Sequence, residues 1–195
     1  MNQRLTDIAM LCIVVGVASA CGSTPPSRFY TLSPTTKSDA RPSTLSVAVG
    51  PVSVPGVVDR PEIVVSTGTN EVRLEEFNRW AAPLQEELPR VIAENLAAML
   101  GTRHVTLFPQ SLGADVEFRV TVEVQRFETE PGKGATLHAV WIVRCVHDGK
   151  THTGLTIVRE TVRDNSYDAL AAAHSRAVAR LSQDISDSIR ALASL

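Results

Sequence analysis

The 195-residue chain has 19 Lys and Arg residues against 21 Asp and Glu residues, which gives a formal net charge of −2. A nearly neutral chain without any Lys/Arg cluster longer than two residues excludes nucleic-acid binding through a basic patch. At this length one domain is expected, with a core large enough to fold without disulfides or metals.

The start of the chain has the pattern of a bacterial lipoprotein signal. An apolar run from Ile8 to Ala18 is followed by Ser, Ala and then Cys21. The run is too short to span a bilayer, which needs about 20 apolar residues. A thiol at this place can accept a diacylglyceryl group, so we expect cleavage before Cys21 and lipidation of Cys21. An ordinary secretory signal is the alternative.

The expected lipid anchor predicts where the mature chain works. Two or more acyl chains hold a protein on a membrane essentially permanently, because each buried methylene contributes about 0.8 kcal/mol. Gly22 follows the cysteine, and the absence of Asp there resembles lipoproteins that Gram-negative bacteria pass on to the outer membrane. We therefore expect an outer-membrane lipoprotein that faces the periplasm.

Composition divides the chain into three parts. Residues 1–20 are the expected signal peptide, 21–28 a lipidated tether and 29–195 a single periplasmic domain. Within the domain, residues 33–43 are rich in Ser, Thr and Pro and bury too little apolar area to order themselves. This stretch is predicted to be a flexible surface loop.

Short strands are expected in the first half of the domain. The segments concerned alternate apolar and polar residues, or are bounded by Gly, Pro and Asn. Gly68 and Asn70 separate the last two, which favours a hairpin. The expected strands are residues 29–32, 45–49, 62–66 and 71–74.

An amphipathic helix is expected next. Its apolar residues recur at helical spacing, and Gly101 ends the pattern. Pro89 lies inside the pattern and has no backbone donor, so the helix either kinks at Pro89 or begins near it. The apolar stripe consists of Leu84, Leu88, Ile92 and Leu96, with Val91 and Met99 beside it.

Three strands and a long helix are predicted in the second half. Residues 116–124 alternate clearly, and residues 135–146 are apolar on both faces, which favours a central strand. Asp148-Gly149 is a strong two-residue hairpin signal, with a returning strand around 155–158. Asn165 or Ser166 is expected to cap the final helix.

These elements predict the fold class. Two amphipathic helices and about six strands, mostly joined as hairpins, favour an α+β fold. The apolar stripe of each helix needs a sheet to cover it. We therefore expect an antiparallel or mixed sheet with both helices packed on one face.

Residues that carry chemistry are few. If Asp148-Gly149 is a two-residue turn, Cys145 faces His152, and a Cys/His dyad or a metal-ligand pair is conceivable. A zinc site needs four ligands, and a thiol protease needs a cleft and an oxyanion site that a flat hairpin does not provide. His174 is expected to be a satisfied residue at the boundary of the core. We therefore expect no catalytic residue, no metal, no cofactor and no enzyme.

Three stretches together resemble one known family. They are residues 21–34, with Pro-Pro-Ser-Arg-Phe-Tyr-Thr-Leu; residues 49–61, followed by Arg79-Trp80-Ala81; and residues 167–181, which begin Tyr-Asp-Ala-Leu. They resemble the PqiC family of ABC-type transport auxiliary lipoproteins. The resemblance implies an outer-membrane docking subunit for a PqiB-like MCE-domain protein, whose tube carries lipids or other hydrophobic molecules between membranes. It also implies a homo-oligomeric ring.

Two places are candidate partner contacts. Asp59-Arg60-Pro61 lies in a loop with a proline turn, and Arg79-Trp80 places a cation and a large ring where a helix is expected to begin. In the structural alternative, Trp80 caps the core and Arg79 pairs with Glu75 or Glu76. At the level of function, the alternatives are a self-contained lipid- or ligand-binding lipoprotein and a hydrolase that uses Cys145 and His152.

Overall fold

The computed structural model describes residues 25–36, 40–109, 115–162 and 164–194. The predicted signal peptide, Cys21 and the first part of the predicted tether lie outside the described residues, as do residues 37–39 of the predicted loop 33–43. The elements are β1 (Arg28–Tyr30), β2 (Val47–Ser53), β3 (Glu62–Ser66), β4 (Val72–Trp80), α2 (Leu84–Leu100), β5 (Val105–Leu107), β6 (Phe118–Glu130), β7 (Gly134–Cys145), β8 (Thr151–Thr161) and α3 (Tyr167–Ala193).

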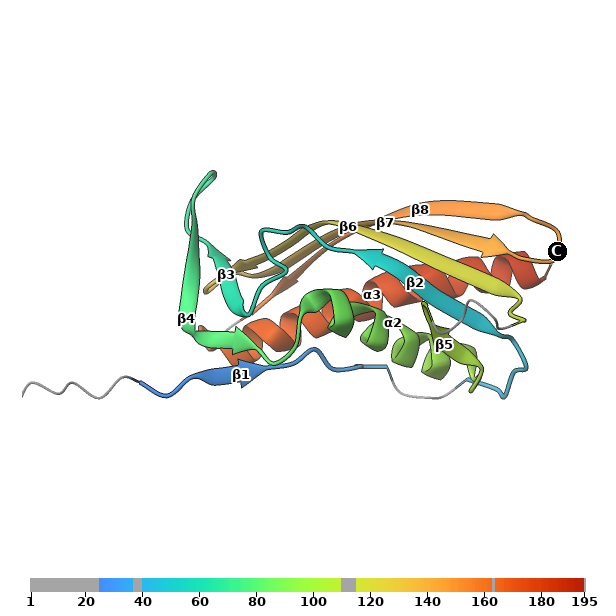
Figure 1. Cartoon of the computed structure of the whole chain (residues 1–195), viewed down its shortest axis with the longest axis horizontal. Coiled ribbons are helices and arrows are strands. Elements are labelled where there is room, and N and C mark those ends of the chain that lie inside the picture. Colours follow the sequence, from blue (N-terminus) through green and yellow to red (C-terminus); the bar gives the residue numbers. More distant parts are fainter. Residues whose placement is uncertain (1–24, 37–39, 110–114, 163, 195) are drawn as a thin grey trace, which may run out of the picture.

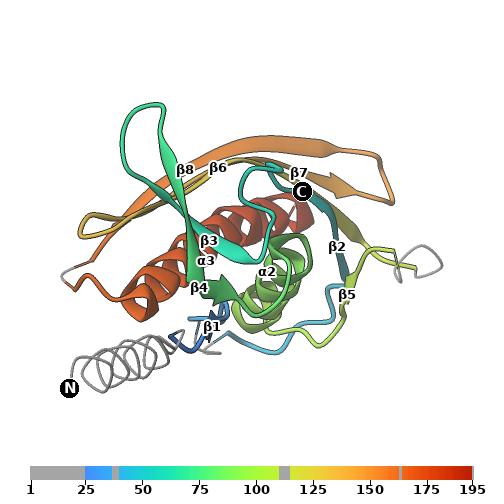
Figure 2. The same cartoon turned by 60° about the vertical axis from the view of Figure 1, so that its left-hand side comes forward.

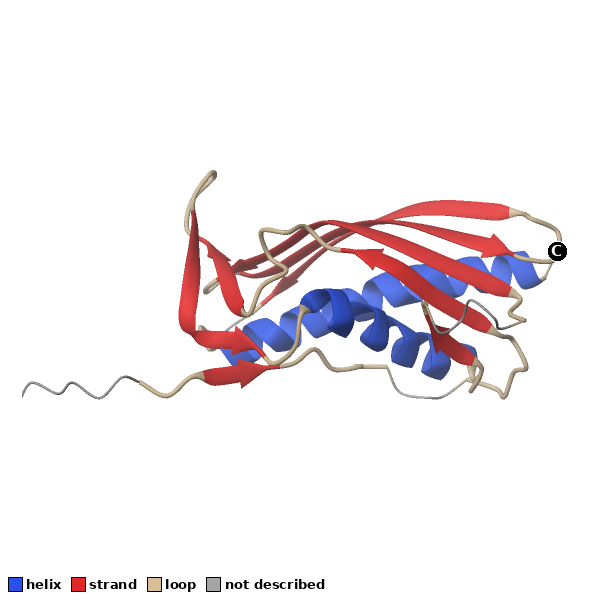
Figure 3. Ribbon diagram, in the orientation of Figure 1, coloured by secondary structure: helices blue, strands red, loops and turns tan. Residues whose placement is uncertain are grey.

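Eight strands form one curled, mixed sheet (Figures 1 and 3). β6 pairs antiparallel with β7, and β7 pairs antiparallel with β8, so β7 is an interior strand, as predicted. The other edge of β6 is shared: β2 pairs in parallel with its first half, and β3 meets it at Val65 and Thr129. Figure 2 shows the sheet arching over α2 and α3. The predicted α+β fold with both helices on one face is confirmed, and the sheet is mixed.

Local signals explain where the helices begin. Ser166 is the N-cap of α3, because its Oγ accepts the N–H of Ala169 at 3.2 Å. α2 begins at Leu84 and runs through Pro89, which therefore lies inside the helix. Among the described residues, no helix is both long and apolar enough to cross a membrane.

Several strands differ from the prediction. β4 continues to Trp80, so Arg79-Trp80 lies at the end of a strand rather than at the start of α2. β6 continues to Glu130, and β5 was not expected. The strands lengthen because pairing with distant segments extends them beyond their local pattern.

The N-terminal segment is held to the body at several points. β1 pairs in parallel with the end of β4. Beyond β1, the N–H of Leu32 donates to Glu87 at 3.2 Å, and its carbonyl accepts from Arg90 at 2.9 Å. The N–H of Ser33 donates to Oγ of Ser175 at 3.1 Å. Both helices therefore contact this segment.

Candidate functional site

One surface pocket brings together all four candidate contact residues, Asp59, Arg60, Arg79 and Trp80. It lies where the loop before β3, the end of β4 and the start of α2 meet, and its volume is about 270 Å³. Phe29 of β1 also lines it. The curl of the sheet therefore joins the two places that the sequence singled out separately.

Asp59 stabilises the start of α2. Its Oδ1 accepts the N–H of Gln85 at 3.1 Å. The N-cap residue of the helix is Pro83, which makes no side-chain cap hydrogen bond. Asp59 thus supplies the missing acceptor from another loop, and its negative charge is favourable at a helix N-terminus.

Glu62, which the sequence reasoning missed, holds both arginines of the pocket. Its carboxylate accepts from Nε of Arg60 at 3.2 Å and from Nη2 of Arg79 at 3.1 Å. The pKa of Glu62 is lowered, chiefly by a hydrogen bond from its own backbone and then by the Arg60 side chain. The expected pairing of Arg79 with Glu75 or Glu76 is wrong, because the β3–β4 register places Arg79 directly opposite Glu62.

Trp80 forms the floor of the pocket. Its side chain is 5% exposed and meets the rings of Phe127 and His174 edge-on, at centroid distances of 6.2 and 5.9 Å. Trp80 therefore caps the core, as the structural alternative predicted. The exposed part of the pocket is its rim, where Phe29 is 64% exposed and the Arg60 side chain 40% exposed.

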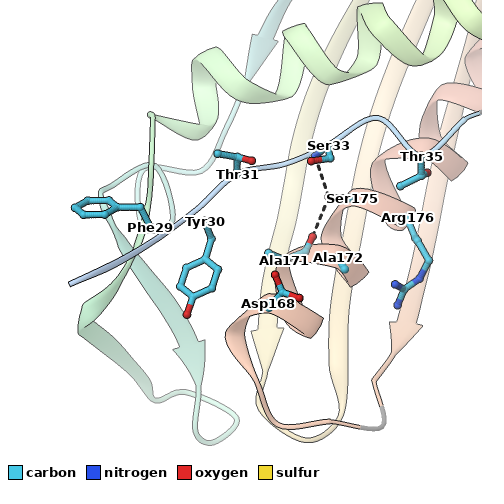
Figure 4. Close-up of a pocket in the computed structure, with 10 residues that line it drawn as sticks. All are labelled: Phe29, Tyr30, Thr31, Ser33, Thr35, Asp168, Ala171, Ala172, Ser175 and Arg176. Carbon is cyan, nitrogen blue, oxygen red and sulfur yellow. Dashed lines mark hydrogen bonds between the residues drawn. The ribbon is translucent and has the colours of Figure 1, made fainter. Parts of the chain in front are cut away.

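A second pocket, of about 500 Å³, lies between β1 with the residues that follow it and the first turns of α3 (Figure 4). Ser33, Ser175 and Arg176 of this pocket have partners within the chain. The Ser175 hydroxyl donates to the carbonyl of Ala171 at 2.9 Å and accepts from Ser33, and Arg176 pairs with Glu160 at 2.9 Å. The Ser175 hydroxyl is therefore engaged by backbone groups on both sides.

The expected facing of Cys145 and His152 is wrong. The loop between β7 and β8 is longer than two residues, because the N–H of Cys145 donates to the carbonyl of Lys150 at 2.9 Å. His152 therefore lies opposite Val143, and its Nδ1 is 2.7 Å from Oγ of Ser188 on α3. The dyad on which the hydrolase alternative depended does not form. Within the described part of the chain, no three His, Cys, Asp or Glu side chains gather as metal ligands.

His174 lies in the core rather than at its boundary. It is fully buried, stacks on Phe127 with ring centroids 4.0 Å apart, and places Nε2 2.8 Å from Oγ1 of Thr129. Burial lowers the pKa of His174 to about 3, because the charged imidazolium would lose its hydration. The ring is therefore neutral at physiological pH.

Comparison with known proteins identifies the family. The model of the ABC-type transport auxiliary lipoprotein component family matches residues 30–186, from the end of β1 into the last turns of α3. The chain belongs to this family. As an auxiliary lipoprotein, it is a membrane-anchored component of the envelope associated with transport.

Two solved structures resemble the auxiliary lipoprotein along most of its length. A crystal structure of an uncharacterized protein has a TM-score of 0.69 and 20% identity, covering 85% of this chain and 99% of that one. A protein from Xanthomonas campestris has a TM-score of 0.63 and 17% identity, covering 82% and 93%. These likenesses show the fold alone.

A weaker similarity joins the auxiliary lipoprotein to the PelC dodecamer from Paraburkholderia phytofirmans. The TM-score is 0.39 and the identity 14%, with 70% of this chain and 84% of that chain covered. A similarity at this level supports no inference about assembly. No curated protein matches the chain.

Proposed function

We propose that this auxiliary lipoprotein is a non-enzymatic docking subunit of an MCE-type intermembrane lipid transport system. In this proposal Cys21 carries the acyl chains, the anchor lies in the outer membrane, and the domain faces the periplasm and binds a PqiB-like MCE-domain protein. The observation that carries the proposal is the family match over residues 30–186. The pocket around Arg60 is the proposed contact.

The construction of this pocket supports a role in docking. Asp59, Arg79 and Trp80 form its floor and wall through contacts within the chain. Arg60 stands on its rim, where its side chain is 40% exposed. An arginine that stands on a rigid base is a common centre of binding energy in protein interfaces. A partner would bind here without further ordering of the domain.

Replacing Arg60 by alanine tests the docking proposal. Tagged protein from detergent-solubilised envelopes is expected to co-purify with an MCE-domain protein. Arg60→Ala should lower the recovery about tenfold, because loss of a central interface arginine commonly costs more than about 1 kcal/mol.

Arg126→Ala is the matched control for this experiment. Arg126 is an exposed strand arginine that pairs with Glu128 two residues along, just as Arg60 pairs with Glu62. Its side chain is 52% exposed, against 40% for Arg60. Equal losses in both variants, or no MCE-domain protein with the unsubstituted chain, would contradict the proposed contact.

The proposed ring has a suitable surface on β8. This strand pairs with β7 and lies at the edge of the sheet. Its outward side carries Leu155 and Ile157, which are 56% and 62% exposed, and Ile142 on β7 is 41% exposed. Large exposed aliphatic residues on an edge strand favour contact with another chain, and a second copy is the proposed occupant.

Glutamate at both Leu155 and Ile157 is expected to convert the ring to monomers while the fold is kept, because charges would be buried in an apolar interface. Sedimentation velocity of the detergent-solubilised protein measures the change in mass. Val57→Glu is the control, since Val57 is 54% exposed on the loop before β3. A monomeric unsubstituted protein would rule out the ring.

A self-contained lipid-binding lipoprotein is supported less well. It would need a cavity between the helices and the sheet to hold an acyl chain. Leu88, Leu137 and Leu181 are fully buried in that layer and belong to one continuous core. The two pockets described above adjoin β1 instead.

A further inference from the structure

The N-terminal segment that leads to the proposed anchor leaves the domain at one end of the molecule. β1 is held beside the end of β4, and Pro25, the first described residue, comes four residues after Cys21. An extended chain spans at most about 3.5 Å per residue, so these two residues lie within about 14 Å. In Figure 1, β1, β3 and β4 lie at this end, and the C-terminus and the β7–β8 loop lie at the opposite end.

Phe29 is the most exposed large apolar residue among those the structure describes, at 64%. Neighbouring side chains on a strand point to opposite sides, so Phe29 and Tyr30 face different ways (Figure 4). Tyr30 packs against Tyr167 at a centroid distance of 6.1 Å, and its hydroxyl donates to Asn78 at 3.0 Å. These contacts fix the strand and keep the Phe29 ring turned outwards.

Phe29 lies on the rim of the pocket that Arg60 lines, where the Arg60 side chain is 40% exposed. Val57 is 54% exposed on the loop that carries Asp59 and Arg60 to this pocket. An exposed aromatic ring suits the bilayer interface, where such rings enter the headgroup layer.

The tether itself would bring Phe29 close to the membrane that holds the anchor. Acyl chains at Cys21 would keep Phe29 within about 28 Å of the bilayer at all times, since eight residues separate the two positions. Holding the ring this close to the bilayer raises the effective concentration of lipid around it, so a weak contact made by one ring is favoured.

We infer that Phe29 rests in the interfacial layer of the membrane that holds the anchor. The inference depends on the lipidation of Cys21 that is part of the proposed function. The β7–β8 loop points away from the membrane.

Contact with brominated lipid tests this inference. The full acylated protein, carrying Phe29→Trp or Val146→Trp, is reconstituted into phosphatidylethanolamine and phosphatidylglycerol vesicles with or without brominated acyl chains. Val146 is the matched position, because it is 41% exposed on the β7–β8 loop at the far end. Trp80 and Trp141 are 5% and 4% exposed, and their signal is subtracted with the unsubstituted protein.

The fluorescence of the tryptophan introduced at position 29, after subtraction of the unsubstituted protein, is expected to fall about twofold in brominated vesicles. The fluorescence of the tryptophan introduced at position 146 is expected to stay constant. No quenching at position 29 overturns the membrane contact, and equal quenching at both positions overturns the orientation. Intact mass is measured on the same sample, and a chain without acyl groups overturns the anchor on which the inference depends. The vesicles contain no transport partner, so the docking proposal is tested separately.

Discussion

Replacing Gly154 by alanine is expected to lower the free energy of unfolding by about 3 kcal/mol, the upper range for overpacking a buried site. A Cβ at Gly154 would lie 2.5 Å from Cε2 and Cη2 of Trp141, where carbon atoms normally stay about 3.5 Å apart. The indole cannot move aside without loss. It is 4% exposed, and its Nε1 donates to Thr156 at 3.0 Å, which donates to Asp184 at 2.6 Å.

Urea unfolding of the detergent-solubilised protein, followed by circular dichroism, measures this change. Gly56→Ala is the matched control, because a Cβ at Gly56 would meet nothing within 4 Å, and it should change stability by less than about 0.5 kcal/mol. In a Trp141→Phe background the cost of Gly154→Ala should fall by at least about 1 kcal/mol, because phenyl is shorter than indole. The same cost in both backgrounds would show that Trp141 is not the obstacle.

Acidification from pH 7.5 to pH 5 is expected to lower the free energy of unfolding by about 2 kcal/mol. The pKa of His174 is about 3 in the folded protein and 6.5 without burial, so the unfolded chain binds a proton that the folded protein excludes. The contribution that neutral His174 makes to the free energy of unfolding is fully present above pH 6.5. It is lost progressively as the pH falls towards 3. The lowered pKa values of Glu62 and Asp148 act in the same direction but only below about pH 4.5.

His174→Leu should flatten the dependence between pH 7.5 and pH 5. The variant loses the contact with Thr129, so its stability at pH 7.5 is expected to be lower. The two proteins are therefore compared by how much their free energy of unfolding changes between pH 7.5 and pH 5, measured by urea unfolding at both pH values. A slope that is the same in the leucine variant would contradict the assignment to His174.

The parts of the fold that depend on near neighbours in the chain were predictable. Helical spacing predicted α2 and α3, and alternation predicted the first half of β6. The parallel pairs were not predictable, such as Arg28 with Asn78 in β1 and β4, or Val47 with Val105 in β2 and β5. Parallel strands are not joined by a turn, so no local pattern records which segments meet.

The four candidate contact residues lie in one pocket, and several contacts predicted from the sequence were wrong. Glu62 matters because the pairing of β3 with β4 places it opposite Arg79. Phe29 matters because its side chain remains exposed in the folded domain. The Cys145–His152 error has a single cause. Asp-Gly marks a turn but does not set the loop length, and a longer loop moved His152 opposite Val143.

Tension on the acyl anchor would enter the body through β1, and the direction of that strand decides how the load is shared. β1 runs parallel to β4, which leads directly into α2, so a pull along the tether loads all three register pairs together, in shear. The contacts of Leu32 with Glu87 and Arg90, and of Ser33 with Ser175, pass the remaining force to both helices. A moving partner would thus pull against the whole domain instead of peeling off its first strand.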